Sequence, residues 1–237
     1  MIASVHIADV GKRTALRLLR TKPSPAKVLG LRYAEIATAA PLSGHLLPRP
    51  NPGRVGLIAA WDDDRAFEDF LASHPLAEQL AHGWHVRLQP TRIVGAWPQL
   101  AGLLAGEQPM DDAEPAAVLT LGRLRLSQTI RFLAASARAE GLVVRDPALL
   151  ASTGLARPPG LVATFSLWRS TAAMRAYARG DAEVGHLAAI QAHAARPFHH
   201  ESAFVRFRPY RAEGRWDGCD PLGGMGSNAH ESLITTE

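Results

Sequence analysis

The feature that most constrains the fold is a pattern that occurs twice along the chain. Gly53–Trp61 aligns with Gly160–Trp168, since both segments follow a proline, are mainly apolar or small, and end in tryptophan. In each copy an amphipathic helical pattern with a polar cap, a second helical piece and an extended segment follow the tryptophan. Each copy closes on Gly-x-Trp, at Gly95–Trp97 and Gly214–Trp216. Five features in the same order predict one structural unit present twice.

The order of the expected elements identifies this unit. Short β-rich segments at residues 4–10 and 117–124 predict an opening strand in each copy, and each leads into a helical pattern. A second strand is expected to begin at Gly30-Leu31 in the first copy and at Gly141-Leu142 in the second. Each copy is therefore β-α-β-β-α-β, the ferredoxin-like unit. Two copies predict an α+β fold whose sheets face one another.

The same pattern divides the chain into regions. We expect a first ferredoxin-like unit over residues 1–104 and a second over residues 116–218. Residues 105–115 are acidic, contain proline and lack periodicity, which is typical of a linker. Residues 219–237 are rich in glycine, serine and asparagine, so we expect a flexible tail.

Composition excludes several classes of protein. Of the 237 residues 47% are apolar, which rules out disorder as the main state. The 26 cationic and 22 acidic side chains give a net charge of +4 that is spread along the chain, so no nucleic-acid partner is expected. No apolar run approaches the ~20 residues that span a bilayer, and we expect a cytoplasmic protein. The single cysteine, Cys219, excludes an internal disulfide and a thiolate metal cluster.

The last predicted strand, residues 202–210, presents two different faces. One face carries only apolar side chains, and the other mixes aromatic residues with arginine: Ala203, Val205 and Phe207 against Phe204, Arg206, Arg208 and Tyr210. Two interpretations stay open. The strand packs on one side and is partly solvated on the other, or Arg206 and Arg208 form a pocket wall that holds the carboxylates of a cofactor or substrate.

The histidines offer candidate metal ligands without a known metal motif. His186 and His193 are seven residues apart, so they share one face of a predicted helix. Such a histidine is either a buried side chain with one hydrogen bond or an axial ligand of haem iron. In His199-His200-Glu201, neighbours in an extended strand point to opposite faces, so only His199 and Glu201 could share a metal. Two ligands do not close a site, and we interpret these residues as the start of the last strand.

Several segments taken together resemble the spheroidene monooxygenase (acyclic carotenoid 2-ketolase) family. In the second copy these are Thr164–Trp168, Tyr177–Arg179 and Phe204–Arg208, and in the first they include Gly56–Trp61 and Ser73–Pro75. The resemblance covers residues 3–218. It implies a duplicated ferredoxin-like fold of the dimeric α/β barrel type. It also implies an oxygenase that uses haem, dioxygen and a ferredoxin-type electron donor on an acyclic carotenoid.

The resemblance also suggests roles for particular residues. We expect His186 to be the axial ligand of one haem b, between the sheet and the helices of the second copy. Arg206 and Arg208 are candidates for pairing with the propionates, and Tyr177 is a further cofactor-binding candidate. The alternative is a cofactor-free α/β barrel module that binds a small apolar ligand or a protein partner. A homo-oligomer is compatible with either function.

Overall fold

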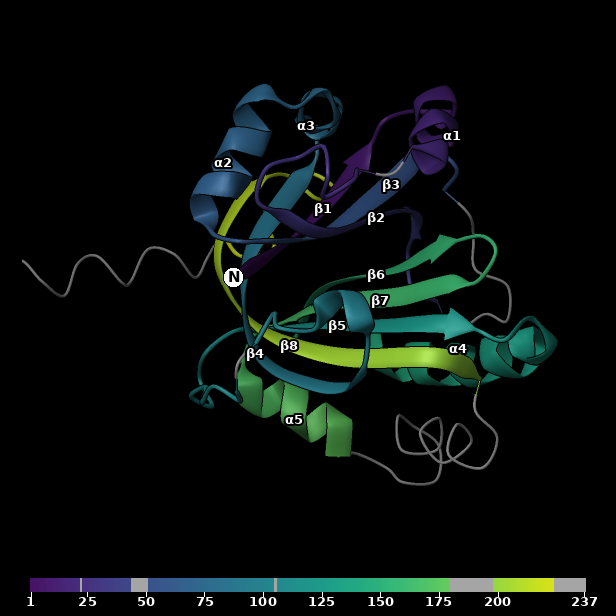
Figure 1. Cartoon of the computed structure of the whole chain (residues 1–237). Helices are drawn as coiled ribbons and strands as arrows, with labels where there is room; N and C mark the ends of the chain where they lie inside the picture. Colours follow the sequence, from purple (N-terminus) through teal and green to yellow (C-terminus); the bar gives the residue numbers. More distant parts are fainter. Residues whose placement is uncertain (22, 44–50, 105, 180–197, 224–237) are drawn as a thin grey trace, which may run out of the picture.

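The computed structural model describes residues 1–21, 23–43, 51–104, 106–179 and 198–223. Eight strands form one closed antiparallel barrel in the order β1-β3-β2-β6-β7-β5-β8-β4 (Figure 1). The first half contains β1 (Ile2–Asp9), α1 (Lys12–Arg20), β2 (Leu31–Ala40), β3 (Arg54–Trp61), α2 (Asp64–Ser73), α3 (Pro75–Leu80), β4 (Trp84–Ala96) and the 3-10 turn η1 (Pro98–Leu100). The second half contains β5 (Ala116–Leu124), η2 (Leu126–Gln128), α4 (Thr129–Val143), β6 (Leu149–Arg157), β7 (Leu161–Trp168), α5 (Thr171–Arg179) and β8 (His199–Gly214).

Each half contributes four adjacent strands in the same internal order, β4-β1-β3-β2 and β8-β5-β7-β6. The halves join where β2 pairs with β6 and where β4 pairs with β8. The predicted α+β class and the barrel are therefore confirmed. The shared order is what a duplicated unit requires, while the duplication itself and the unit boundaries stay predictions. Closure pairs every strand on both sides, so the barrel has no exposed edge.

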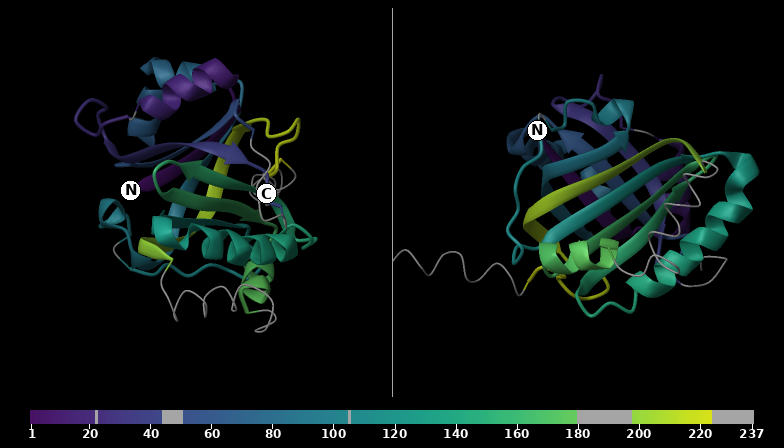
Figure 2. Two further views of the ribbon diagram at one scale, coloured as in Figure 1. Left: turned by 90° about the vertical axis from the view of Figure 1, so that its right-hand side faces the viewer. Right: turned by 90° about the horizontal axis from the view of Figure 1, so that it is seen from below.

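The helices lie on the two outer faces of the barrel. In Figure 1 the helices α1, α2 and α3 lie above the strands of the first half, and α4 and α5 lie below those of the second half. Figure 2 shows the same arrangement from two further sides, with α4 along one edge of the strands in the view from below. None of the helices among the described residues is long and apolar enough to cross a membrane.

The interior of the barrel is filled by apolar side chains from both halves. Val5, Leu88, Phe165 and Val205 come from four different strands and are fully buried there. Aromatic rings close one end of the barrel: the centroids of Trp84 and Trp216 are 5.3 Å apart, and that of Phe165 lies 6.4 Å from each.

The opposite end of the barrel carries two ion pairs. Arg157 Nη1 lies 3.0 Å from Glu35 Oε2, and Arg123 Nε lies 2.8 Å from Glu201 Oε2. The Arg123 guanidinium also stacks over the ring of Trp97, 4.8 Å from its centroid. The interior core therefore belongs to both halves at once, because the residues that seal each end come from both.

Local sequence explains the junction between α2 and α3. The side chain of Asp63 caps α2 by accepting a hydrogen bond from the backbone nitrogen of Ala66. His74 ends α2 and begins α3, because its Nδ1 accepts from the backbone nitrogen of Leu76, and Pro75 occupies the first turn. His74 is therefore a helix junction, in agreement with its position before a proline.

One predicted strand start is wrong. Gly141 and Leu142 lie inside α4, which continues to Val143, and the strand β6 begins only at Leu149. A glycine near the end of a helix costs only about 1 kcal/mol relative to alanine, so Gly141 does not stop the helix. The chain leaves α4 through turns that end at Asp146.

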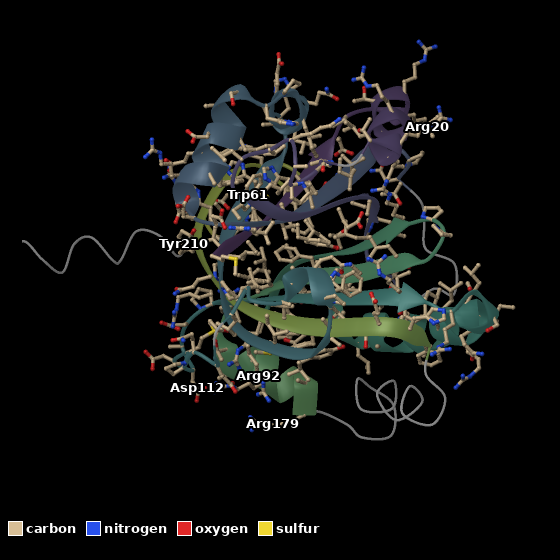
Figure 3. The ribbon with its side chains drawn as sticks, in the orientation of Figure 1. Arg20, Trp61, Arg92, Asp112, Arg179 and Tyr210 are labelled. Carbon is tan, nitrogen blue, oxygen red and sulfur yellow. The ribbon has the colours of Figure 1, made fainter. Side chains whose placement is uncertain are left out.

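The predicted linker packs on the barrel. Within residues 106–115, which we call the strap, Glu107 Oε1 lies 3.2 Å from Arg206 Nη2 and Glu114 Oε2 lies 3.0 Å from Arg208 Nη2. Figure 3 marks Asp112 of the strap, whose carboxylate bonds Arg175 of α5 at 2.6 Å. The acidic composition of the strap is thus matched by arginines of β8 and α5.

The beginning of the predicted tail also contacts the barrel. Trp216 and Cys219 form a β-bridge, and Trp84 Nε1 donates to Asp220 Oδ1 over 3.3 Å. Just before the tail, Asp217 bonds the guanidinium of Arg54. Residues 219–223 are therefore held at the aromatic end of the barrel, and residues 224–237 lie outside the described part.

Candidate functional site

The outer face of the first half is a sealed core. Its strand residues, which we call the first outer face, are all buried: Ser4, His6, Ala8, Ala34, Ile36, Val55, Leu57, Ala59 and Trp61. Ala15 and Leu18 of α1 and Phe67 and Phe70 of α2 pack on this face and are buried as well. Large apolar side chains on both sides leave no free surface between this sheet and its helices.

The outer face of the second half differs in both size and burial. Four of its strand residues, Ala116, Val118, Gly122 and Trp168, are buried. The others, which we call the second outer face, are half-buried: Thr120, Ser152, Gly154, Val162, Thr164, Ser166, Ser202 and Phe204. Most of these side chains are small or carry a hydroxyl group. Small residues also occur on the first outer face, at Ser4, Ala8, Ala34 and Ala59, but there they are buried.

Of the helices over the second outer face that the structure describes, α4 buries few of its own side chains. Among the side chains of α4 that the structure describes, Val143 is the only one that is buried. The helix is held instead through α5, because Tyr177 Oη donates to the backbone oxygen of Ala139 over 3.2 Å. The Tyr177 ring packs 5.1 Å from Trp168, and burial raises the pKa of Tyr177 to about 12. Tyr177 is thus a protonated hydrogen-bond donor at neutral pH.

His199 and Glu201 lie at the start of the last strand, as predicted, but they do not share a face, because a β-bulge separates them. Glu201 pairs with Arg123, but the register then shifts and His199 pairs with Leu124, so β8 contains an extra residue at this point. Glu201 bonds Arg123 at the ion-paired end of the barrel. The imidazole of His199 instead lies over Gly122 on the second outer face. A bulge moves one side chain to the other face of a sheet, so these residues do not share a metal.

His199 is held tightly at one end of the second outer face. A Cβ at Gly122 would come within 2.5 Å of His199 Cδ2 and 2.6 Å of Nε2. The ring of Phe132 from α4 packs edge-on, with its centroid 5.2 Å from that of the imidazole. Sequence reasoning missed this arrangement, and its only signal was a glycine in the middle of an otherwise apolar strand.

Arg206 and Arg208 lie on the outside of β8 and are already paired. Besides Glu107, Arg206 donates from Nε to Thr91 Oγ1 over 3.2 Å, and it is almost completely buried. Burial lowers the pKa of Arg206, although an arginine remains charged. Arg208 donates to the backbone oxygen of Pro109 over 3.0 Å. The carboxylates of the strap therefore pair with Arg206 and Arg208, the two arginines that were predicted to pair with carboxylates of a ligand.

The other predicted ligands fall in a part of the chain that the structure does not cover. His186 and His193 both lie within residues 180–197, outside the described residues. Tyr177, Arg206 and Arg208 are described, and all three lie on the outside of the second half. Within the described ranges, no group of three or more His, Cys, Asp or Glu side chains is placed to hold a metal ion.

The first outer face contains a histidine pair that the sequence did not suggest. His6 of β1 lies opposite His85 of β4, and their rings stack with centroids 5.0 Å apart. The Nε2 atoms of both are buried and have no hydrogen-bond partner. Burial lowers the pKa of His6 well below its ordinary value, and the neighbouring His85 lowers it further. Burial also lowers the pKa of His85. Both imidazoles are therefore neutral at pH 7, His6 in the core and His85 half-buried beside it.

These features define a class of protein: a closed α+β barrel of two ferredoxin-like halves, in which one outer face is sealed and the other is partly open. No protein-family model matches the chain. A solved aldoxime dehydratase structure is 10% identical, with a TM-score of 0.49 over 94% of this chain and 84% of that chain.

Two relatives show the family. A spheroidene monooxygenase from Rubrivivax gelatinosus is 34% identical over 175 residues, which are 72% of this chain and 66% of that protein. A spheroidene monooxygenase from Rhodobacter capsulatus is 31% identical over 182 residues, 74% of each chain. The chain belongs to the spheroidene monooxygenase family, as the sequence motifs predicted. It spans about two thirds of the length of the Rubrivivax gelatinosus relative.

Proposed function

We propose that this protein is a haem-dependent monooxygenase that acts on an apolar, carotenoid-like substrate. The observation that carries the proposal is the second outer face, where small, half-buried side chains lie beneath an incompletely packed helix. Membership of the spheroidene monooxygenase family supports the reaction class. Small-molecule sites are commonly apolar with a few polar groups. The second outer face supplies apolar contacts at Val162 and Phe204 and a larger share of serine and threonine hydroxyls.

The residues on this face fit a flat, largely apolar cofactor. Gly154, Thr120, Thr164 and Ser166 are small, so a planar group would meet little steric obstruction over them, whereas the imidazole of His199 fills the space over Gly122. His186 is the proposed axial ligand, and Tyr177 borders the face. Haem iron, when bound, binds and activates dioxygen. This chain would supply the ligand, the apolar surroundings and the polar groups that orient the reactants.

Arg206 and Arg208 are the proposed partners of the haem propionates. Because Glu107 and Glu114 already pair with them, the propionates would have to share or replace these carboxylates. The double variant Glu107→Gln/Glu114→Gln removes the competing charges, so it is expected to raise the affinity for haem, measured by absorbance titration. An unchanged affinity would mean that Arg206 and Arg208 pair only with the strap and do not bind the propionates.

The proposed reactants are an acyclic carotenoid, dioxygen and electrons from a ferredoxin-type donor. Phe204 and Val162 supply apolar contacts for a polyene on the second outer face. A monooxygenase places one oxygen atom of dioxygen in a C–H bond and releases the other as water. Two electrons and two protons are consumed, and the electrons come from the donor.

One experiment tests the cofactor and the reaction together. The full chain is produced with haem, and its absorption spectrum is recorded beside His186→Ala and His193→Ala. We expect a Soret band in the wild type that disappears only in His186→Ala. Incubation with spheroidene, dioxygen and a reducing system should give a product heavier by oxygen in mass spectrometry. A wild-type chain without a Soret band would favour the alternative, a cofactor-free module that binds an apolar ligand or a partner.

A further inference from the structure

We propose that the outward side of α4 binds the head-group region of a membrane that contains anionic lipids. The surface, which we call the α4 patch, consists of four exposed aliphatic side chains and three exposed arginines: Leu126, Ile130, Leu142 and Val144 with Arg125, Arg131 and Arg145. This inference goes beyond the proposed reaction, because such a surface needs neither the cofactor nor the substrate.

The aliphatic side chains of the α4 patch lie in solvent at both ends of the helix. Ile130 is 79% exposed and Leu126 68%, and Leu142 and Val144 at the other end are 39% and 41% exposed. Among the described residues, nine large apolar side chains are exposed, and these four belong to α4 and its ends. A single exposed leucine is normal on a protein surface, whereas several on one element mark an interaction site.

The geometry of α4 directs the patch away from the barrel. Phe132 faces the barrel, because its ring centroid lies 6.2 Å from that of Phe198 at the start of β8. Val143 is buried. Successive residues of an α-helix are about 100° apart around its axis, so Ile130 lies about 160° from Phe132 and about 140° from Val143. In the view from below in Figure 2, α4 lies along one edge of the strands, where its outward side can meet a flat surface.

The exposed charges of the patch are positive. Arg125, Arg131 and Arg145 are exposed. The acidic residues within the same segment, residues 125–146, are Glu140 and Asp146, and both are half-buried. Each of these carboxylates accepts a hydrogen bond from a backbone nitrogen, over 3.0 Å for Glu140 and 2.9 Å for Asp146. The patch is therefore complementary in charge to anionic lipid head groups.

The composition of the patch favours a lipid surface over a protein partner. Leucine and isoleucine beside arginine are typical of helices that lie in a membrane interface, where the aliphatic side chains enter the acyl boundary and the cations reach the phosphates. The centre of a protein interface is typically rich in tyrosine, tryptophan and methionine, and the α4 patch contains none of these. Because aliphatic side chains are exposed at both ends of α4, the helix would lie flat on the membrane.

The basic helix α1, on the other side of the barrel, provides a comparison. Its exposed cations are Lys12, Arg13, Arg17 and Arg20, but Leu16 is its one exposed large apolar side chain. Attraction by charge alone would therefore favour α1 at least as much as the α4 patch. A comparison of the two surfaces shows whether the aliphatic side chains matter.

The test measures how the full chain partitions onto lipid vesicles, without haem or substrate. Cosedimentation with vesicles of equal parts phosphatidylcholine and phosphatidylglycerol is compared with cosedimentation with phosphatidylcholine vesicles. Leu126→Ser/Ile130→Ser removes two aliphatic side chains of the patch, and Arg145→Gln removes one of its charges. Leu16→Ser/Leu29→Ser is the matched control, because these leucines of the first half are 54% and 89% exposed. Circular dichroism checks that every variant is folded.

We expect the wild type to bind the mixed vesicles and to be released as the salt concentration rises. Leu126→Ser/Ile130→Ser should lower the partition coefficient by about tenfold, because two side chains no longer enter the acyl boundary. Arg145→Gln should lower it by about fivefold, the effect of one cation near an anionic surface. Leu16→Ser/Leu29→Ser should match the wild type.

Several outcomes would overturn the assignment. A folded wild type that binds neither kind of vesicle would refute it, and so would equal binding by the wild type and Leu126→Ser/Ile130→Ser. Loss of binding only in Leu16→Ser/Leu29→Ser would move the membrane surface to the first half. If the wild type self-associates in analytical ultracentrifugation and Leu126→Ser/Ile130→Ser alone is monomeric, the patch is an interface between copies of the chain instead. A chain that binds vesicles through the patch but forms no oxygenated product refutes the proposed function alone.

Discussion

The contrast between the two outer faces predicts that equivalent truncations will differ in cost. Phe67 of α2 is fully buried, and its ring lies 5.6 Å from His6, 5.5 Å from Trp61 and 5.1 Å from the guanidinium of Arg87. Truncating such a residue to alanine costs about 4 kcal/mol, since it removes transfer free energy and leaves a cavity. At ~2–4 °C per kcal/mol for a chain of this size, Phe67→Ala should lower Tm by ~8–16 °C.

Phe132 of α4 provides the comparison on the second outer face. It is only half-buried, so about half of the ~2 kcal/mol gained by burying a phenylalanine is at stake. Phe132→Ala should therefore lower Tm by ~2–4 °C, measured by circular dichroism in the same buffer. Ile130→Ala on the same helix is the control, because Ile130 is 79% exposed and its loss should change stability by less than about 0.5 kcal/mol. If Phe132→Ala unfolded as early as Phe67→Ala, the second outer face would be a sealed core and the argument for a ligand there would fail.

Three further predictions concern buried side chains that are charged or can become charged. Burial lowers the pKa values of His6 and His85, so the unfolded chain takes up protons at a higher pH than the folded chain. The free energy of unfolding should therefore be constant above pH ~6.5 and fall below it by up to about 1.4 kcal/mol per pH unit for each histidine. Urea melts should show a weaker pH dependence in His6→Gln and an unchanged one in the exposed His82→Ala. Glu107→Gln leaves the buried Arg206 without its carboxylate and should cost about 1–2 kcal/mol in the same melts. Glu35→Gln should cost about 3 kcal/mol, since Glu35 is only 5% exposed and bonds Arg157 inside the barrel. For both, Glu213→Gln is the control, because its pair with Arg211 is exposed at both ends and should contribute less than about 0.5 kcal/mol.

The sequence was sufficient for the parts of the fold that short-range patterns determine. The strands that end in Trp61 and Trp168 are mainly apolar segments bounded by proline and polar caps, and both occur where the pattern placed them. The last strand was located as well, although it extends from His199 to Gly214 and is longer than predicted. Its long pairing with β4 accounts for the extra length, and pairing between distant segments leaves no periodic signal in either one.

The candidate site was less predictable because it depends on a single inserted residue. One unpaired residue in β8 reverses the direction of His199, and alternation alone assigns that side chain to the wrong face. The partners of the strap were not predicted either. Its carboxylates Glu107 and Glu114 pair with Arg206 and Arg208, which are about a hundred residues away in sequence. Composition does not reveal such pairs.

The closed barrel explains how one half can leave its outer face unsealed. A single ferredoxin-like sheet depends on its helices to bury one side. Here the second half is also held by strand pairs on both flanks, β2 with β6 and β4 with β8, and by an interior core shared with the first half. Packing of α4 then contributes little to folding, which agrees with its single buried residue among those described. Small residues on the second outer face are therefore tolerated at low cost in stability.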